Sequence, residues 1–376
     1  MQPFGVYVHI PFCASRCDYC DFATWTDRAH LIDDYVAACV TDVIRRTAAG
    51  GLPAATSVFF GGGTPSLLAA DELVRILDAV PRADDAEVTV ECNPDSVDLA
   101  KLAAYAGAGV NRLSFGVQSM RPHVLAELGR THDRANVERA VAWAREAGID
   151  NINLDLIYGS PSETLDDWRA SLDGALALDP PHVSAYALTV EAGTPLGQRV
   201  AAGEQAGPDD DVQADYYAVA DDRLGAAGLG WYEISNWARP GHECRHNLLY
   251  WRQAEYVGVG CAAHGHTPAG RRWWNVRTPE RYIELVAAGE PTEAGRETLD
   301  GERVADERLV LALRTRAGAD VAAGETANGL IDAGLLERVS ANRVTLTRRG
   351  RLLATDVTAR LLDAADRPAP VAISTR

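Results

Sequence analysis

Apolar and polar positions follow two alternating patterns through the first half of the chain. Short apolar runs that suit strands are followed by amphipathic stretches that suit helices, and each run ends in a polar or glycine-rich turn. This repetition is typical of β-α units around a parallel sheet. Strands are expected at Val6 to Ile10, Ser57 to Phe60, Glu87 to Cys92, Arg112 to Val117, Ile152 to Ile157 and His182 to Leu188. Helices are expected near 31–48, 70–80, 96–106, 134–147 and 164–178, with Asp71, Ser96 and Thr164 as caps.

Six such units predict an α/β fold, a partial (β/α)6 barrel over residues 1–195. Residues 196–300 open with a loop rich in glycine, proline and acid, and continue as an extension with many aromatic residues. Residues 301–376 predict helix, helix, β-hairpin and helix, which is a small winged-helix-like domain. Arginines on its hairpin could contact phosphates, but such side chains are more often solvated, which we expect for Arg343, Arg348, Arg349 and Arg351.

Composition restricts the partners of the 376-residue chain. Hydrophobic residues make up 47% and charged residues 24%, as in a folded protein. Acidic residues outnumber basic ones by 53 to 36, and the net charge of −17 argues against a nucleic-acid partner. The sequence contains no transmembrane segment and no signal peptide, so we expect a cytoplasmic protein that can still meet a membrane-bound client. Seven cysteines, an odd number, do not suit a disulfide framework.

Three of these cysteines, Cys13, Cys17 and Cys20, lie between the first strand and the first helix. This is the mouth of the expected barrel, where ligands of such folds bind. A [4Fe-4S] cluster normally takes four thiolates, so three would leave one iron open to another ligand. Zinc is the rival, but a structural zinc site needs four ligands and usually has CxxC pairs. Three cysteines buried only as filler would not be expected to cluster in one loop.

Further polar or small residues stand where the other expected strands end. The run Gly61-Gly62-Gly63-Thr64-Pro65 follows the second strand, and absent side chains there allow the backbone to approach a ligand closely. Glu91, Gln118 and Asp155 end the third, fourth and fifth strands. Each could instead cap a helix, but three in succession favour ligand contact. Arg130 could pair with a carboxylate.

CxxxCxxC is the signature of the radical S-adenosylmethionine (SAM) superfamily, in which SAM chelates the open iron of the cluster. The segments YVHIPFCASRCDYCDF, GGGTPS, VECNP, FGVQS, LGRTHD and NLDLIYGSP resemble the oxygen-independent coproporphyrinogen III oxidase (HemN-like) family, and the resemblance spans nearly the whole chain. It implies that Cys13, Cys17 and Cys20 hold the [4Fe-4S] cluster. It also implies that SAM is bound by Tyr7, Tyr19, Gly62, Gly63, Thr64, Glu91, Gln118, Arg130 and Asp155.

Two departures from the oxidases favour another branch of that family. The oxidases carry a fourth motif cysteine where this chain has Phe22, and they have an N-terminal extension that is missing here. The chain also has an HNxxYW motif that begins at His246, which resembles the HemW heme chaperone branch. That branch binds heme and passes it to heme-requiring client proteins such as respiratory enzymes. The alternative is a radical SAM enzyme, either a coproporphyrinogen III dehydrogenase or a HemN-like methyltransferase, and SAM cleavage would require an electron donor.

His246 is the leading candidate for a heme ligand. Its imidazole could bind heme iron, and Tyr250 and Trp251 offer flat apolar surface for a porphyrin. The other reading is a packed aromatic corner with a hydrogen-bonded histidine. Nearby rivals as ligand are His242, Cys244, His264 and His266, whereas core filling is the expected role of Cys39, Cys92 and Cys261.

Overall fold

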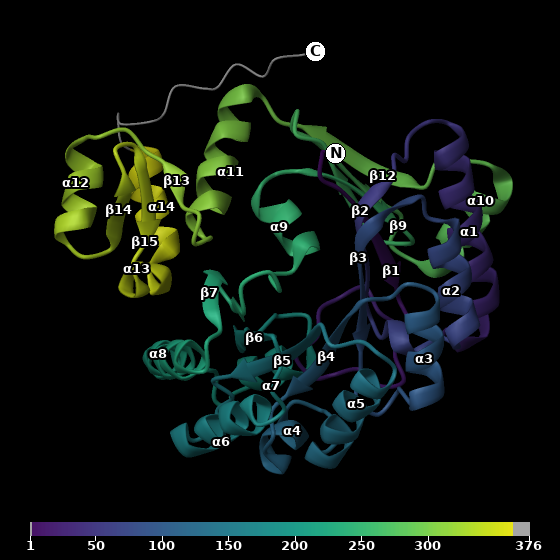
Figure 1. Cartoon of the computed structure of the whole chain (residues 1–376), viewed down its shortest axis with the longest axis horizontal. Helices are drawn as coiled ribbons and strands as arrows, with labels where there is room; N and C mark the ends of the chain where they lie inside the picture. Colours follow the sequence, from purple (N-terminus) through teal and green to yellow (C-terminus); the bar gives the residue numbers. More distant parts are fainter. Residues whose placement is uncertain (1, 364–376) are drawn as a thin grey trace.

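The structure is a computed structural model that describes residues 2–363 (Figure 1). Its centre is a run of parallel strands in sequence order, as the pattern predicted. Side chains that point outward to the helices are largely apolar and buried, whereas several that point into the barrel are polar, such as Ser114 and Asp155. The strands are β1 (Phe4–Ile10), β2 (Ala55–Gly62), β3 (Arg82–Cys92), β4 (Arg112–Gln118), β5 (Ile152–Tyr158) and β6 (His182–Ala187).

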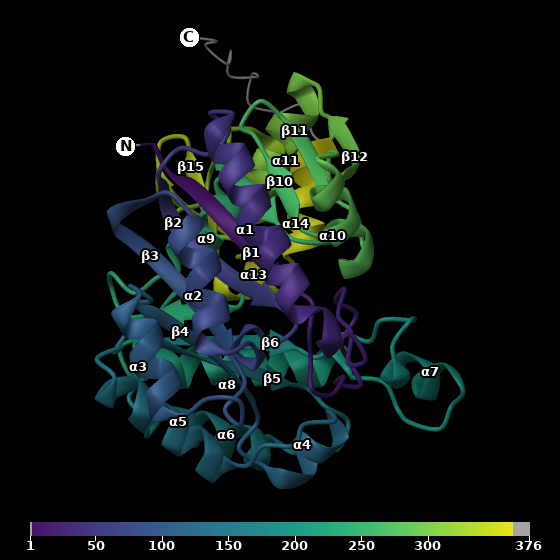
Figure 2. The same ribbon diagram turned by 90° about the vertical axis from the view of Figure 1, so that its right-hand side faces the viewer.

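The expected helices lie on the outside of this half-barrel (Figures 1 and 2). They are α1 (Ile32–Ala48), α2 (Ala70–Ala79), α3 (Leu99–Gly107), α5 (Arg134–Glu146) and α6 (Leu165–Leu176), and the short α4 (Pro122–Glu127) precedes α5. Thr164 caps α6 as predicted, since its side chain accepts from the amide of Asp167. The predicted cap Ser96 is wrong, because Asp98 accepts from the amide of Lys101 and starts α3 later. Asp71 is likewise no cap, since it lies inside the first turn of α2.

Residues 196–300 lengthen the same sheet at both edges. On one side β9 (Glu255–Val259) pairs in parallel with β1, and β10 (His264–His266), β11 (Arg271–Asn275) and β12 (Glu293–Thr298) follow. On the other side β8 (Asn236–Ala238) pairs with β6, and β7 (Gly230–Glu233) forms the edge. The region also contributes helices α7 (Pro195–Ala201), α8 (Asp210–Ala226), α9 (Arg245–Trp251) and α10 (Pro279–Ala288). Its buried side chains, such as Trp237 and Tyr282, belong to the same core as the barrel.

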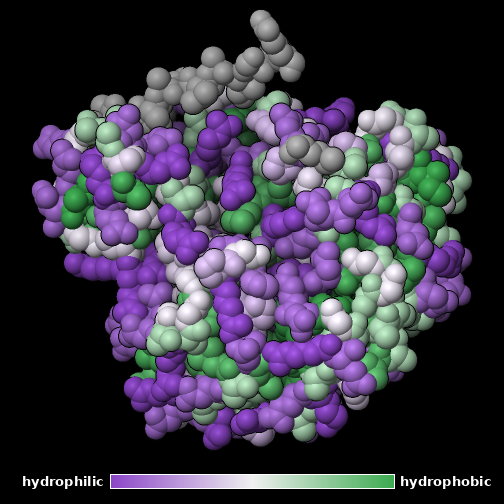
Figure 3. Space-filling view, viewed as in Figure 1, coloured by the Kyte–Doolittle hydropathy of each residue, from purple (hydrophilic) through white to green (hydrophobic). Residues whose placement is uncertain are grey.

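The C-terminal lobe has its own hydrophobic core and the order of elements of a winged helix. It consists of α11 (Gly301–Leu313), β13 (Ala319–Asp320), α12 (Glu325–Asp332), β14 (Leu336–Ser340), β15 (Arg343–Leu346), α13 (Arg348–Leu352) and α14 (Ala354–Asp363), and lies at the left of Figure 1. The α/β class, the partial barrel and the small second lobe are therefore confirmed. None of the helices among residues 2–363 is long and apolar enough to cross a membrane. Hydrophilic side chains cover much of the face in Figure 3.

Two of the four arginines of this lobe, Arg348 and Arg351, are not simply solvated, which corrects the prediction for them. The Arg351 side chain is only 7% exposed, lies over the rings of Tyr217 and Trp231, and pairs with Asp221 at 2.7 Å. Arg348 pairs with the same carboxylate at 2.8 Å. These contacts hold the lobe against α8 and β7, because an arginine stem and guanidinium pack well on aromatic faces. Arg343 pairs with Asp320 and Arg349 donates to the carbonyl of Ala333.

Candidate functional site

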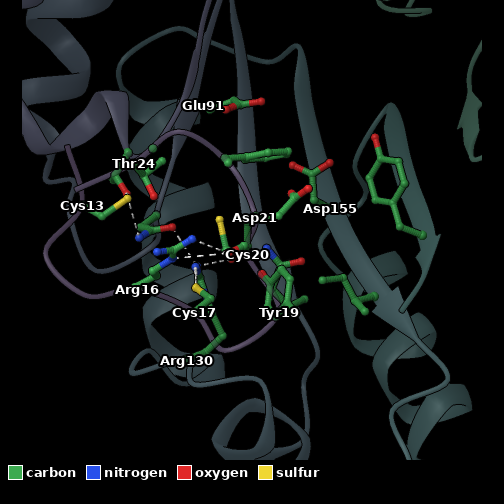
Figure 4. Close-up of a pocket in the computed structure, with 18 of the residues that line it drawn as sticks. Cys13, Arg16, Cys17, Tyr19, Cys20, Asp21, Thr24, Glu91, Arg130 and Asp155 are labelled. Carbon is green, nitrogen blue, oxygen red and sulfur yellow. Dashed lines mark hydrogen bonds between the residues drawn. The ribbon is translucent and has the colours of Figure 1, made fainter. Parts of the chain in front are cut away.

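The loop that leaves β1 holds Cys13, Cys17 and Cys20 at the carboxyl ends of the strands (Figure 4). Backbone hydrogen bonds fix its ends: the Cys13 amide donates to the carbonyl of Trp25 at 3.1 Å, and the Cys20 amide donates to the carbonyl of Cys17 at 3.2 Å. All three cysteines are partly exposed, whereas the other four are buried. The loop therefore presents these thiols to a cavity instead of packing them in the core.

The thiols do not form a compact single-ion site. Within residues 2–363, no three histidine, cysteine or acidic side chains are grouped closely enough to hold one metal ion. Cluster ligands have no such requirement, because each thiolate binds a different iron atom. Burial raises the pKa of Cys13 and Cys20, so an iron ion would have to displace the protons.

Arg130 reaches the cysteine loop from a distant part of the chain. Its Nη1 lies 3.4 Å from the Cys17 sulfur, and its Nη2 donates to Asn93 Oδ1 at 2.7 Å and to the Gly116 carbonyl at 2.8 Å. Its Nε is buried and has no hydrogen-bond partner among the described residues. A largely buried guanidinium that is only partly satisfied is suited to hold a carboxylate or a thiolate.

The glycine run brings backbone against the cysteine loop. A Cβ added to Gly63 would lie 2.6 Å from the Phe12 carbonyl oxygen and 3.0 Å from the Cys13 sulfur. Gly62 has a φ of +111°, and its Cβ would meet the ring of His9 at 2.4 Å. Only glycine fits at these two positions. The Gly62 amide donates to Glu91 Oε2 at 3.1 Å, which ties the run to the end of β3.

The polar residues at the strand ends carry unusual electrostatics. Burial, followed by the nearby Asp155 carboxylate, raises the pKa of Glu91 to about 8. Burial also raises the pKa of Asp155, although Ser114 donates to it at 2.7 Å. Gln118 has a left-handed φ of +63°, and its buried Oε1 has no partner among the described residues. Strain and unsatisfied polar atoms of this kind are typical of binding sites.

These residues surround one cavity of about 480 Å³. The predicted residues that line it are Cys13, Cys17, Tyr19, Cys20, Gly62, Gly63, Thr64, Glu91, Gln118, Arg130 and Asp155. Tyr7 does not reach it, because its side chain faces a neighbouring polar chamber of about 220 Å³ and contacts His9 Nδ1 at 3.1 Å. Glu91 and Asp155 line both cavities, so Tyr7 lies on the same inner side of the barrel as they do but at the level of the chamber, which a motif match alone does not fix.

His246 lines the smaller chamber and is enclosed there. Its side chain reaches Ser57 Oγ from Nδ1 and the Tyr250 hydroxyl from Nε2, both at 2.9 Å, and the residue is 1% exposed. Burial lowers the pKa of the imidazole to about 3, so the ring is neutral. Its face stacks on Phe59, with the ring centroids 5.2 Å apart. Iron could reach a nitrogen only if one of these hydrogen bonds opened, and the assignment of His246 as heme ligand stays a prediction.

The rival ligands differ in exposure. Cys244 and His266 are buried, and the amide of Cys244 is bound by Tyr232. His242 contacts Asn151 Oδ1 at 3.2 Å, whereas His264 is exposed beside Trp274. The buried Cys39, Cys92 and Cys261 fill the core as expected.

Several cavity residues were not predicted. Tyr186, Leu188 and Glu191 line the cavity at and beyond the end of β6, and Phe22 lines it directly after the cysteine loop. The rule that ligands lie at carboxyl ends of strands, applied to the sixth strand as well, would have found the first two. For Phe22, the sequence pattern indicates only that a cysteine is absent.

A half-barrel of parallel strands with three cysteines after the first strand defines the class of radical SAM proteins. A family model described as the radical SAM superfamily matches residues 7–174. The chain is 44% identical to the heme chaperone HemW of Mycobacterium tuberculosis, covering 96% of this chain and 95% of that protein. It is 36% identical to the Bacillus subtilis protein of the same name, covering 94% and 97%. The chain therefore belongs to the HemW heme chaperone family, and the resemblance seen in its motifs is confirmed.

A solved structure agrees with this fold. Coproporphyrinogen III oxidase (HemN) from Escherichia coli, described as a radical SAM enzyme, superposes with a TM-score of 0.83 over 96% of this chain and 90% of its own. The two sequences are 22% identical, so the likeness establishes the shared architecture and leaves the activity open.

Proposed function

We propose that this chain is a heme chaperone: it binds a [4Fe-4S] cluster and SAM at the mouth of the barrel, binds heme, and delivers heme to client proteins. The observation that carries the proposal is its similarity along almost the whole chain to heme chaperones. Phe22 supports it, because a side chain that is 60% exposed replaces a thiol that the oxidases have.

Cys13, Cys17 and Cys20 are the proposed cluster ligands. They are the partly exposed thiols of the chain, and Arg130 and Thr64 lie within 3.4 and 3.7 Å of two of their sulfurs. When cluster and SAM are both bound, the pair can supply one-electron chemistry. The chain positions them with groups that cost no rearrangement, since the glycine backbone and Arg130 already line the cavity.

SAM is the proposed ligand of the same cavity. Arg130 suits the carboxylate of its methionine part, and Glu91 and Asp155 are placed to accept hydrogen bonds from donor groups. Glu91 holds its proton near neutral pH, so it can also donate. Gln118 offers an unsatisfied carbonyl oxygen to a ligand. Tyr7 does not contact SAM in this proposal. Its hydroxyl positions the ring of His9, which packs against Gly62 of the cavity.

The clients that we propose are respiratory enzymes, which the cytoplasmic chain would meet at a membrane surface. An electron donor is part of the proposal only if SAM is cleaved during delivery. The second candidate is a radical SAM enzyme, for which the same three cysteines and the same cavity would serve.

One anaerobic preparation tests both candidates. The cluster is reconstituted, SAM is added, and the chain is loaded with heme and mixed with the apo form of a respiratory cytochrome, while coproporphyrinogen is supplied in a parallel reaction. We expect the apo-cytochrome to take up heme from the loaded chain faster than it takes up free heme from buffer. We expect no conversion of coproporphyrinogen. Conversion of the porphyrinogen without heme binding would contradict the proposal and support the enzyme.

A further inference from the structure

Two aromatic side chains that line the cluster cavity are exposed to solvent. Among the described residues, the large hydrophobic side chains that remain exposed include two aromatic ones, Phe22 at 60% and Tyr186 at 40%. Both line the cavity that also holds the three cysteines. Exposed aromatic side chains cost free energy in water, so two at the mouth of one cavity point to a ligand that covers them.

The two aromatic residues belong to an apolar part of the lining that matches no proposed SAM position. Ile157 and Leu188 line the same cavity, and with Phe22 and Tyr186 they form the set that we name the aromatic rim. Arg16 is an exposed cation of the same lining, and its guanidinium donates to the Cys20 carbonyl. The lining thus combines flat apolar surface with a cation at the solvent side.

Tyr186 is held so that its ring, not its hydroxyl, is open to the cavity. Burial and the adjacent Asp155 carboxylate raise the pKa of its hydroxyl, and the hydroxyl also interacts with Asn236 and Ser184. Tyr186 lines the small chamber as well as the large cavity. A ring anchored at its polar end presents a rigid apolar surface at little entropic cost.

The chamber around His246 is poorly suited to a porphyrin. Pockets for ligands of drug size hold roughly 300–1,000 Å³, and the chamber, at about 220 Å³, is smaller than that range. Both nitrogens of His246 are engaged, and its backbone amide is bound by Glu87 Oε1 at 3.0 Å. These contacts attach the start of α9 to the barrel strands β2 and β3.

We infer that heme docks on the aromatic rim, with its ring against Phe22 and Tyr186 and a propionate near Arg16, while the HNxxYW segment is structural. Asp21 and Glu191 also line the cavity, and their charges disfavour propionates on their side. This inference rests on the proposed function, since it assumes that heme is the cargo. It places the cargo next to the cluster and away from His246.

The test compares heme affinities of cluster-loaded variants by titration in the Soret band. Phe22→Ala is expected to raise the heme Kd by about tenfold, and Phe22→Ala with Tyr186→Leu by about a hundredfold, because each ring loses a stacking surface. Phe22→Trp should keep the affinity of the natural chain. Ile44→Ala is the matched control, because Ile44 is 55% exposed on α1 and does not line the cavity.

Iron and sulfide contents check that each variant carries the cluster. The loop uses the Phe22 backbone, whose carbonyl accepts from the Thr24 amide at 2.8 Å, so the side-chain change should leave the cluster in place. Natural affinity in the cluster-loaded double variant would overturn the inference. So would loss of heme binding in a folded His246→Gln variant while Phe22→Ala binds normally. Absence of heme binding by the natural chain would instead overturn the proposed function, and the inference with it.

Discussion

The cluster cavity and the chamber around His246 adjoin inside one barrel, yet they differ in how far their polar groups are satisfied. In the cavity, three thiols are partly exposed, and Gln118 and Arg130 keep buried atoms without partners among the described residues. In the chamber, both nitrogens of His246 are hydrogen bonded, and a buried Arg112 Nε is left without a partner among the described residues. Because buried polar groups are normally paired, the larger number of open groups in the cavity indicates a site prepared for a ligand, whereas the paired imidazole of His246 indicates an architectural role.

The largest expected effect is the loss of the cluster from the cavity when one of its three thiols is removed. Cys17→Ser should abolish the bound cluster, since two thiolates would remain for four irons. The fold should survive, because Cys17 lies in a partly exposed loop. Iron and sulfide analysis after anaerobic reconstitution measures the effect, with far-ultraviolet circular dichroism as the fold check. Cys39→Ala is the control that should keep its cluster, because Cys39 is buried in the core and does not line the cavity, and a full cluster in Cys17→Ser would refute the ligand assignment.

A single methyl group in the glycine run should also damage the cavity. Gly63→Ala places a Cβ 2.6 Å from the Phe12 carbonyl, which forces the cysteine loop to move. We expect SAM affinity to fall by more than about tenfold, as measured by calorimetric titration of cluster-loaded protein. Gly107→Ala at the end of α3 is the matched control, because its Cβ would meet nothing within 4 Å. Equal SAM affinity in both variants would argue that the glycine backbone does not touch SAM.

On the chamber side, the expected effect is on stability. His246→Phe leaves the hydroxyls of Ser57 and Tyr250 without their partner and should lower the free energy of unfolding by about 2–4 kcal/mol. Urea denaturation of the cluster-free chain measures it. His264→Phe is the control, since His264 is exposed and should change stability little. A stable His246→Phe chain that no longer binds heme would show that the imidazole is a ligand after all.

The smallest expected effect is a pH dependence that belongs to Glu91. Its pKa is raised to about 8 in the folded chain, so the folded state keeps a proton that the unfolded state releases above its ordinary pKa. The contribution of this carboxyl to the free energy of unfolding is therefore fully present below its ordinary pKa, and it is lost as the pH rises from there to about 8. Glu91→Gln should remove this loss, so that the variant gains on the order of 2 kcal/mol relative to the natural chain between pH 5 and pH 8. Urea denaturation at both pH values measures this difference. An equal difference in the free energy of unfolding between the variant and the natural chain at pH 5 and at pH 8 would disprove the shifted pKa.

The sequence was sufficient to predict the features of the fold and site that depend on residues close together in the chain. The six strands, the Thr164 cap and the cysteine loop each depend on neighbouring residues, and their positions were predicted within a few residues. Strand alternation and capping chemistry act over a few positions, which explains this success.

Long-range contacts could not be predicted. The pairing of β9 with β1 joins residues some 250 positions apart, and His246 finds Ser57 across 189 positions. Arg351 similarly meets Asp221 on α8, which turned an expected solvated side chain into a buried ion pair. Such partners are chosen by the packing of the whole core, on which the local pattern is silent.

The central claim, that the chain carries heme on a cluster-loaded barrel, is tested most directly by a heme titration. The cluster-loaded natural chain is titrated anaerobically with heme, and the Soret band is followed to saturation. The account predicts a shifted band that saturates at one heme per chain. A Soret band that stays that of free heme throughout the titration would contradict it.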